Sequence, residues 1–309
     1  MQQEYQKTWI QRRMYTIFQL TSCLLMVSMV TASMGCPGVC NRGAVSKREG
    51  YCSSLPSNIC GDHCRCSDDP YIQDGYYCDC RGCELNPTAL KTGCQDLFNA
   101  GFTVSGIYRI SPGGVLMDVY CDMNSTYSSS DWRRGGWVVI QKRIDGSTNF
   151  YRNWDSYKNG FGYLQNEHWL GNDHINTLTA NGANELWIEM TNFRGITKRA
   201  RFTRFSVEHE GHQYRLFALG YSAQNVEDAG NLLAYQNGQR FTTYDRDNDS
   251  WNKNCAQRYV GAWWYNACHT SNLNGKYYFG SSTPYGQGIQ WRLFTGLYDS
   301  LKTVTMKIR

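Results

Sequence analysis

Hydrophobic and polar residues follow two different patterns along this chain, and the pattern changes near Cys94. From that point, short stretches rich in β-branched and aromatic residues are separated by Gly, Pro and Ser, which is typical of strands joined by turns. Strands are predicted over residues 106–110, 115–123, 136–144, 184–193, 199–210, 214–221 and 302–309. Short helices are predicted over residues 93–101, 151–160 and 172–180. The pattern predicts an α+β domain built on an antiparallel sheet.

After Gly220 the chain becomes rich in Asn, Asp, Gly and Ser, with aromatic residues between them. We expect a lobe built mostly from loops. A final strand should close it, in which Val304, Met306 and Ile308 alternate as on a half-buried face. Long loops inside a compact domain are usually functional or held by a further constraint. A metal ion and a disulfide are both candidates for that constraint.

The first 34 residues have the pattern of a secretory signal peptide. Arg12 and Arg13 precede an apolar run over residues 14–33 that ends in small residues. An uncleaved signal anchor is the alternative, although polar residues interrupt the run and a membrane anchor needs about 20 mostly apolar residues. No later segment is apolar enough to span a bilayer, so we expect a secreted, extracellular chain with no membrane span after cleavage.

Nine of the fourteen cysteines fall between Cys36 and Cys83. Disulfides persist in oxidising compartments, and so short a segment cannot fold without cross-links. We therefore predict a disulfide-rich module over residues 35–83, followed by a larger domain over residues 84–309. The pairing within the module cannot be deduced. Because nine is odd, we expect one cysteine to bond to another chain and form a disulfide-linked homo-oligomer. Structural zinc is the rival interpretation of the closely spaced cysteines.

Composition and motifs narrow the range of functions that the chain could have. A net charge of +5 is too small to indicate nucleic acid or an anionic membrane as a partner. The basic run over residues 197–204 is interpreted as the solvated face of a strand, with a partner-binding patch as the alternative. The 22 Tyr and 10 Trp favour either a packed core or a binding face. No motif of hydrolases, metalloproteases, P-loop or dinucleotide-binding enzymes occurs, so the chain is predicted not to be an enzyme.

A series of motifs resembles the fibrinogen C-terminal domain family. They are SGIYRI, VYCDM, GGWVVIQKRIDGS, NFYRNWDSYKNGFG, HWLGNDHINTLT, DRDNDSWNKNCA, GAWWYNACHTSNLNGKYYFG and TMKIR. They occur in the family's order over residues 94–309, and the seventh most resembles tachylectin- and ficolin-type lectins. The chain has no collagen-like repeat, so it is not a ficolin by architecture. The resemblance implies a twisted antiparallel sheet, a calcium-binding lobe and two disulfides, Cys94–Cys121 and Cys255–Cys268.

Three alternating acidic residues, Asp245, Asp247 and Asp249, lie in the loop-rich region. Such spacing can bring hard oxygen ligands to one cation, which suits calcium, although a solvated acidic turn is the alternative. The resemblance implies that Ca²⁺ is bound by the side chains of Asp247 and Asp249 and by the backbone carbonyls of Trp251 and Lys253. Asp245 is expected to support the loop.

Two glycosylation sequons are present, beginning at Asn124 and Asn248. Asn248 lies inside the predicted calcium loop, where a glycan would be hard to accommodate. Asn124 is therefore the predicted acceptor.

The same resemblance implies a small pocket beside the calcium loop. In similar lectins this pocket receives an acetyl group. A narrow apolar slot suits the methyl group, and hydrogen-bonding groups suit the acetamide. The resemblance also implies a cis peptide bond before Cys268. The residues matched to the pocket are Cys255, Tyr259, Trp264, His269, Tyr285 and Gly286. Ordinary packing is the alternative role for these aromatic residues.

Two functions are therefore expected in different classes. The first is a calcium-dependent lectin that binds acetylated glycans, such as those carrying N-acetylglucosamine, in innate immune recognition. The second is a protein ligand that binds a receptor or matrix protein. In fibrinogen, two acidic residues of the corresponding pocket hold a peptide amino terminus. This chain has Tyr259 and Gly286 at those two positions. The missing acids favour the acetyl group.

Overall fold

The computed structural model describes residues 91–124, 135–223, 227–280 and 282–309, together with the backbone of residues 45–46, 65–68 and 75–79. The predicted signal peptide lies outside the described residues, as do most of the cysteine-rich module and its disulfides. Among the residues that are described, no helix has the length and apolar character needed to cross a membrane.

The described backbone of the cysteine-rich module forms a small antiparallel sheet. Its strands are β1 (Val45–Ser46), β2 (Arg65–Asp68) and β3 (Gly75–Asp79), in the order β1-β3-β2. The sequence pattern of this segment did not predict strands, because it contains few apolar runs.

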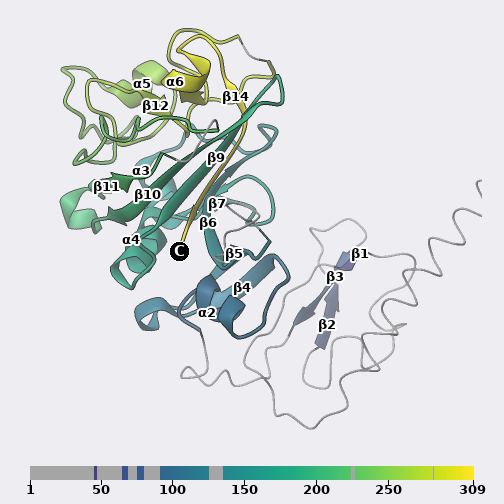
Figure 1. The fold of residues 1–309 in the computed structure, drawn as a ribbon. Helices are drawn as coiled ribbons and strands as arrows, with labels where there is room; N and C mark the ends of the chain where they lie inside the picture. The colour runs from purple at the N-terminus through teal and green to yellow at the C-terminus, as the bar shows by residue number, and fades with distance from the viewer. Residues whose placement is uncertain are drawn as a thin grey trace, which may run out of the picture. The chain divides into compact units, whose positions relative to one another are not determined.

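The larger domain is organised around a sheet whose described strands pair antiparallel in the order β11-β10-β9-β14-β6-β5-β4 (Figure 1). These strands are β4 (Gly106–Ile110), β5 (Met117–Asp122), β6 (Trp137–Arg143), β9 (Leu186–Asn192), β10 (Thr197–Val207), β11 (Leu216–Tyr221) and β14 (Leu301–Ile308). Two short strands, β7 (Phe161–Gly162) and β8 (His168–Trp169), extend it through a β6–β8 pairing. Every predicted strand is therefore found.

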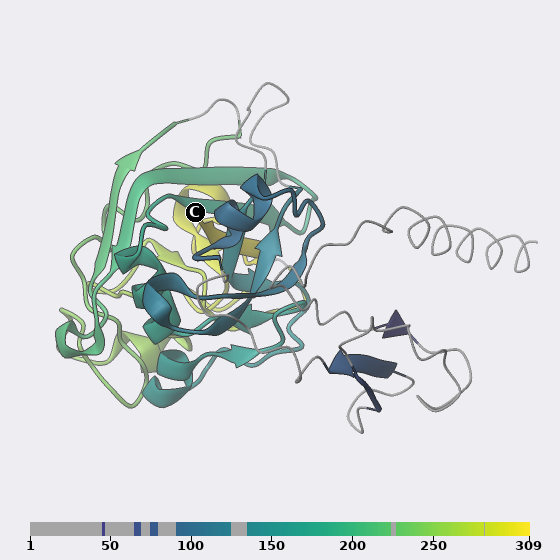
Figure 2. The ribbon, with the colours of Figure 1, turned by 90° about the horizontal axis from the view of Figure 1, so that it is seen from below.

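The last strand of the chain occupies the middle of the sheet. β14 pairs with β9 on one side and with β6 on the other, and the C-terminus lies within the outline of the globe in both views (Figures 1 and 2). Val304, Met306 and Ile308 are fully buried, as the alternation predicts. Lys307 is also buried, because its ammonium pairs with Asp122 at 2.8 Å.

The part of the domain around the sheet also contains three short helices. They are α2 (Cys94–Asn99), α3 (Trp154–Asn159) and α4 (Asn172–Ala180), and two 3₁₀ turns, η3 (Pro112–Gly114) and η4 (Glu210–His212), join other segments. The Cys94–Cys121 disulfide ties α2 to β5, which confirms the first implied pairing. Helix α4 packs on β10 and against α3.

A buried carboxylate holds the turn after β6. Glu167 is fully buried, and its Oε1 accepts backbone N–H groups from residues 144–146 at 2.7–3.1 Å. Its Oε2 accepts the N–H of Thr148 at 2.9 Å, and the buried guanidinium of Arg143 lies 3.8 Å away. A buried charge needs both a counter-ion and hydrogen bonds, and this turn supplies both.

The basic run over residues 197–204 forms most of β10, and two of its arginines are paired with acids. Arg199 pairs with Glu189 at 2.8 Å, and Arg201 is largely buried against Glu185. The expectation of a solvated face is therefore wrong for Arg201, because Glu185, directly before β9, supplies a carboxylate that allows burial.

The last third of the globe is built mainly from loops, as predicted, and it lies at one end of the sheet (Figure 1). It contains α5 (Cys255–Tyr259), α6 (Arg292–Thr295) and a two-stranded pairing of β12 (Ser271–Asn272) with β13 (Gln290–Trp291). Its interior is filled by large aromatic side chains, among them the fully buried Trp263, Trp264 and Trp291. This packing positions the candidate site.

Candidate functional site in the C-terminal lobe

The acidic loop is organised by the Asp249 carboxylate. One of its oxygens accepts the N–H of Trp251 and the other accepts the N–H of Cys255, both at 2.9 Å. The N–H of Asp249 in turn donates to Asp247 at 3.3 Å. Burial, together with the neighbouring Asp247 charge, raises the pKa of Asp249 to about 6. The loop therefore holds two carboxylates close together, at an energetic cost to the ionised form of Asp249.

The groups around these carboxylates fit a cation. Within the described part of the chain, neither Asp247 nor Asp249 has an ion pair, and the Lys253 ammonium lies over the Trp251 ring, 6.0 Å from its centre. The carbonyl oxygens of Trp251 and Lys253 also accept no hydrogen bond from any described residue. Carboxylates and unused carbonyls are the kind of hard oxygen ligands that calcium prefers. No group of three or more acidic, His or Cys side chains gathers as a metal cluster among the described residues.

Asp245 has a different role from the other two acids. Its Oδ1 accepts the backbone N–H of Trp154 at 3.0 Å and the hydroxyl of Thr243 at 2.7 Å. It therefore ties the acidic loop to the start of α3. The side-chain amide of Asn248 donates to the Phe241 carbonyl at 2.8 Å, whereas Asn124 is exposed just after β5.

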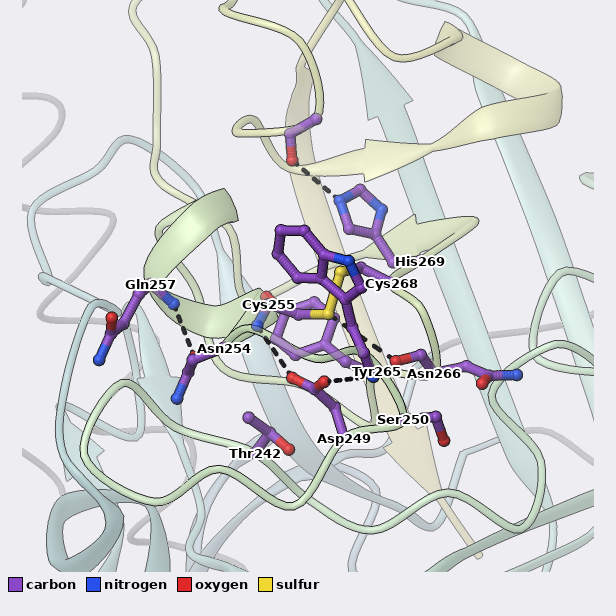
Figure 3. Close-up of a disulfide and its surroundings, with 12 residues drawn as sticks. Thr242, Asp249, Ser250, Asn254, Cys255, Gln257, Tyr265, Asn266, Cys268 and His269 are labelled. Carbon is purple, nitrogen blue, oxygen red and sulfur yellow. Dashed lines mark hydrogen bonds between the residues drawn. A yellow bond between two sulfur atoms is a disulfide. The ribbon is translucent and has the colours of Figure 1, made fainter.

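The Cys255–Cys268 disulfide connects the acidic loop to the predicted pocket, which confirms the second implied pairing (Figure 3). Helix α5 begins at Cys255, where the Asn254 side chain accepts the N–H of Gln257 at 2.9 Å. Asp249 holds the N–H of Cys255 itself. The peptide bond between Ala267 and Cys268 is cis, as the resemblance implied. The acidic loop is thus connected to the residue before His269 by one hydrogen bond and one cystine.

A hollow of about 350 Å³ opens on the far side of this disulfide. The structure brings the predicted residues Tyr259, His269 and Tyr285 together on its wall, beside Cys268. The Tyr259 and His269 rings pack edge to face, with centroids 4.7 Å apart. Other residues complete the lining, namely Tyr235, Ala267, Thr270, Arg292 and Leu297. Tyr235, Arg292 and Leu297 lie outside the motif over residues 261–280, so the sequence pattern could not assign them to the pocket.

Gly286 stands behind this wall. Its carbonyl accepts the N–H of His269 Nε2 at 3.0 Å. Its φ is +75°, and a Cβ at this position would lie 2.4 Å from a carbon of the Tyr259 ring. Only glycine therefore allows this backbone to approach Tyr259 so closely.

His269 is held in one neutral tautomer. A carbonyl oxygen can only accept, so the bond to Gly286 places the proton on Nε2. Burial lowers the pKa of His269 to about 4, because a charged imidazolium loses its hydration there. Its Nδ1 is buried and has no partner among the described residues. His269 therefore has one unused hydrogen-bond acceptor, which is buried.

Several further polar groups at the pocket are unused. In the described part of the chain, the hydroxyls of Tyr235, Tyr259 and Tyr285 make no hydrogen bond, nor do the backbone N–H groups of Cys268 and His269 donate one. Buried tyrosines elsewhere in the domain do bond through their hydroxyls, as three of them show: Tyr157, Tyr214 and Tyr265. The site thus combines aromatic walls with free donors and acceptors, which suits a small amphipathic group.

Two predicted residues lie elsewhere. Trp264 does not line the pocket, because it is fully buried in the core beside Trp169 and Phe241, and its indole N–H donates to the Tyr214 carbonyl at 2.7 Å. Its side chain is committed to packing the lobe. Cys255 is fully buried and contacts the site only through its disulfide partner.

The sequence was compared with known families and proteins. The family described as "Fibrinogen beta and gamma chains, C-terminal globular domain" matches residues 90–309. The chain belongs to this family. Over 232 residues it is 43% identical to Ryncolin-4 of Cerberus rynchops, covering 75% of this chain and 64% of that protein. It is also 43% identical over 223 residues to human Fibrinogen C domain-containing protein 1, covering 70% and 46%. The chain thus spans less than two thirds of these relatives' lengths.

Solved structures agree with the fold. The fibrinogen-like globe domain of human ANGPTL6 matches with a TM-score of 0.65 and 38% identity, covering 71% of this chain and 95% of that one. Lamprey fibrin D-dimer, solved with the peptide Gly-His-Arg-Pro-amide, matches with a TM-score of 0.64 and 29% identity, covering 99% and 86%. The relatives therefore include one protein solved with a peptide ligand.

Proposed function

We propose that this fibrinogen-like globe is a recognition domain that binds acetylated groups on glycans through the hollow beside the Cys255–Cys268 disulfide. The observation that carries the proposal is the set of unused polar groups on an aromatic pocket wall. The N–H groups of Cys268 and His269 suit the acetamide carbonyl, and tyrosine hydroxyls suit its N–H. The faces of Tyr259 and Tyr285 suit the methyl group.

Calcium is proposed to hold this pocket in shape rather than to contact the ligand. The carboxylates of Asp247 and Asp249 and the carbonyls of Trp251 and Lys253 would bind the ion. Their loop is joined to the pocket through Asp249, the N–H of Cys255 and the disulfide. Fixing the loop before binding removes part of the entropy cost of ordering it.

Peptide binding, as in the lamprey fibrin complex, is disfavoured by charge. An amino terminus needs a carboxylate nearby, and the pocket lining contains none, whereas it does contain Arg292. The peptide Gly-His-Arg-Pro-amide is therefore a useful negative control.

Binding of N-acetylglucosamine to the purified protein tests the proposal. The protein is titrated with N-acetylglucosamine, glucosamine and acetate, in calcium and in chelator. We expect N-acetylglucosamine and acetate to compete for an acetylated glycan surface, glucosamine and the fibrin peptide not to compete, and chelator to weaken binding. If neither N-acetylglucosamine nor acetate competes, the acetyl-group function is contradicted and a protein-ligand role is the better explanation.

A single pocket of this size binds weakly, on the order of millimolar, so avidity requires several copies. We propose that the cysteine-rich module over residues 35–83 links chains through disulfides. Electrophoresis with and without reductant tests this. A monomer under both conditions would refute the link without affecting the pocket.

A further inference from the structure

An arginine lies among the acids of the proposed calcium loop, where its charge opposes that of a bound cation. Arg246 stands between Asp245 and Asp247 in the chain, so it directly precedes a proposed calcium ligand. Its backbone is fixed, because it exchanges two hydrogen bonds with the backbone of Thr243, at 3.0 and 3.2 Å. A guanidinium pairs readily with a carboxylate. An arginine at this position could therefore occupy Asp247 and compete with calcium for it.

The guanidinium of Arg246 is instead held by a tryptophan and a glutamate from other segments. Its Cζ lies 4.1 Å from the centre of the ring of Trp154, the first residue of α3. Its Nη1 lies 3.4 Å from Oε1 of Glu210, the first residue of η4. Among the described residues, Arg246 pairs with no carboxylate other than that of Glu210. The arginine is therefore bound to Glu210 and not to Asp247.

Glu210 is itself fixed in place by groups on α3 and α4. Its Oε1 also accepts the indole N–H of Trp154 at 2.8 Å, and its Oε2 contacts the ammonium of Lys158. That ammonium lies 3.1 Å from Asp173 as well. Hydrogen bonds from Lys158 and Trp154 lower the pKa of Glu210, so its carboxylate is ionised at neutral pH. Trp154 is only 4% exposed. The binding site for the Arg246 guanidinium is thus supported by side chains outside the loop.

Resting on the proposed calcium site, we propose that Glu210 is a positioning residue for calcium, which binds the Arg246 guanidinium and so keeps this charge from competing for Asp247. Neither Glu210 nor Arg246 is a proposed ligand of the ion. A nearby cation disfavours the binding of a second one, and an ion pair with the ligand carboxylate would have to break before calcium could bind. It follows that Glu210 matters for calcium only while Arg246 is present.

Calcium titrations of the purified full-length chain, followed by calorimetry, test this inference. Glu210→Gln keeps the shape of the side chain and an oxygen for the Trp154 indole N–H, but it removes the charge that binds Arg246. We expect this variant to bind calcium about three- to fivefold more weakly, which is the size of effect expected for an exposed ion pair. Higher salt should reduce the difference, because it screens the released guanidinium.

Two further variants separate the charge from the fold. Arg246→Gln removes the competing cation, so the double variant with Glu210→Gln should bind calcium within about twofold of Arg246→Gln alone. Glu208→Gln is the matched control. It removes the same charge two residues away, where the carboxylate lies 3.6 Å from Arg215 and does not pair with Arg246, and it should bind calcium as the natural chain does. Thermal unfolding in chelator establishes that each variant is folded.

The inference is overturned if Glu210→Gln binds calcium as tightly as Glu208→Gln, or if the double variant binds as weakly as Glu210→Gln alone. Should Glu210→Gln not fold, Arg246→Gln still decides the matter. It should bind calcium at least as tightly as the natural chain, and a weaker affinity would show that the arginine itself supports the loop. In each of these cases the natural chain still binds calcium, and the proposed calcium site stands. If the natural chain binds no calcium, the proposed site and this inference fail together.

Discussion

Replacing Gly286 by alanine tests the pocket at the point where its backbone and side chains are packed most closely. Gly286 has a φ of +75°, and an added Cβ would lie 2.4 Å and 2.5 Å from two carbons of the Tyr259 ring. The ring has little room to retreat, because the His269 ring packs against it. The methyl group must therefore displace Tyr259 or shift the backbone that accepts the bond from His269.

Two costs add up in this variant. A non-glycine residue in the left-handed region costs about 1–2 kcal/mol, and overpacking by one methyl group costs about 1–3 kcal/mol. We expect Gly286→Ala to lower the free energy of unfolding by about 2–5 kcal/mol. Gly195→Ala is the matched control, because φ there is +78° and no atom lies within 4 Å of the added Cβ. Gly195→Ala should lose only the stability that the left-handed backbone conformation costs, about 1–2 kcal/mol.

Urea unfolding of the two variants, followed by tryptophan fluorescence, measures the difference. Binding of an acetylated sugar is then measured under conditions where both variants are folded. Gly286→Ala should bind at least tenfold more weakly than the natural chain, and Gly195→Ala should bind normally. Equal losses of stability in the two variants, or unchanged sugar binding by Gly286→Ala, would refute the close packing of Tyr259 as the basis of the pocket.

Three further predictions concern the calcium loop, the cystine and the histidine. Calcium at one hundred times its Kd should stabilise the protein by about 2.7 kcal/mol in a thermal shift assay. Asp249→Asn should abolish this calcium-dependent increment, whereas Asp245→Asn should lower the stability without calcium and retain the increment. Equal increments in both variants would exclude this loop as the calcium site. Replacing Cys255 and Cys268 by alanine should lower the free energy of unfolding by about 3 kcal/mol, as expected for a cross-link spanning 13 residues, and should weaken sugar binding. Removing the disulfide between α2 and β5 should also reduce stability, but it should not affect the sugar affinity of the folded protein. The pKa of His269 is about 4 in the folded protein and about 6.5 when unfolded, so the unfolded chain binds a proton at pH 5 that the folded chain does not. The contribution of His269 to stability should therefore fall by about 1–2 kcal/mol between pH 7 and pH 5, whereas Asp249, whose pKa is raised to about 6, contributes in the opposite direction over the same range. The His269 contribution is measured as the difference in stability between the natural chain and His269→Gln at each pH, and a difference that does not change with pH would contradict the assignment.

Local pattern was sufficient to predict the strands and helices around the sheet. Alternation of apolar residues predicts β4, β5 and β14 because each strand has one face against the core, so burial repeats every second residue. The same pattern could not predict that Lys307 would be buried, since that depends on Asp122, which lies on another strand. It also could not predict that β14 would insert between β9 and β6, because strand order depends on pairing between segments far apart in the chain.

The sequence alone determined that the chain carries a closely spaced pair of acids, Asp247 and Asp249, near a short cysteine loop, since these groups lie within a few residues of one another. Family motifs in order identified the domain that contains them. Only the tertiary structure decided which side chains surround the pocket: it placed Arg292 on the wall and withdrew Trp264 into the core. The reason is that a pocket forms where loops from distant segments pack together, and the charge at its mouth depends on which residues that packing leaves unpaired.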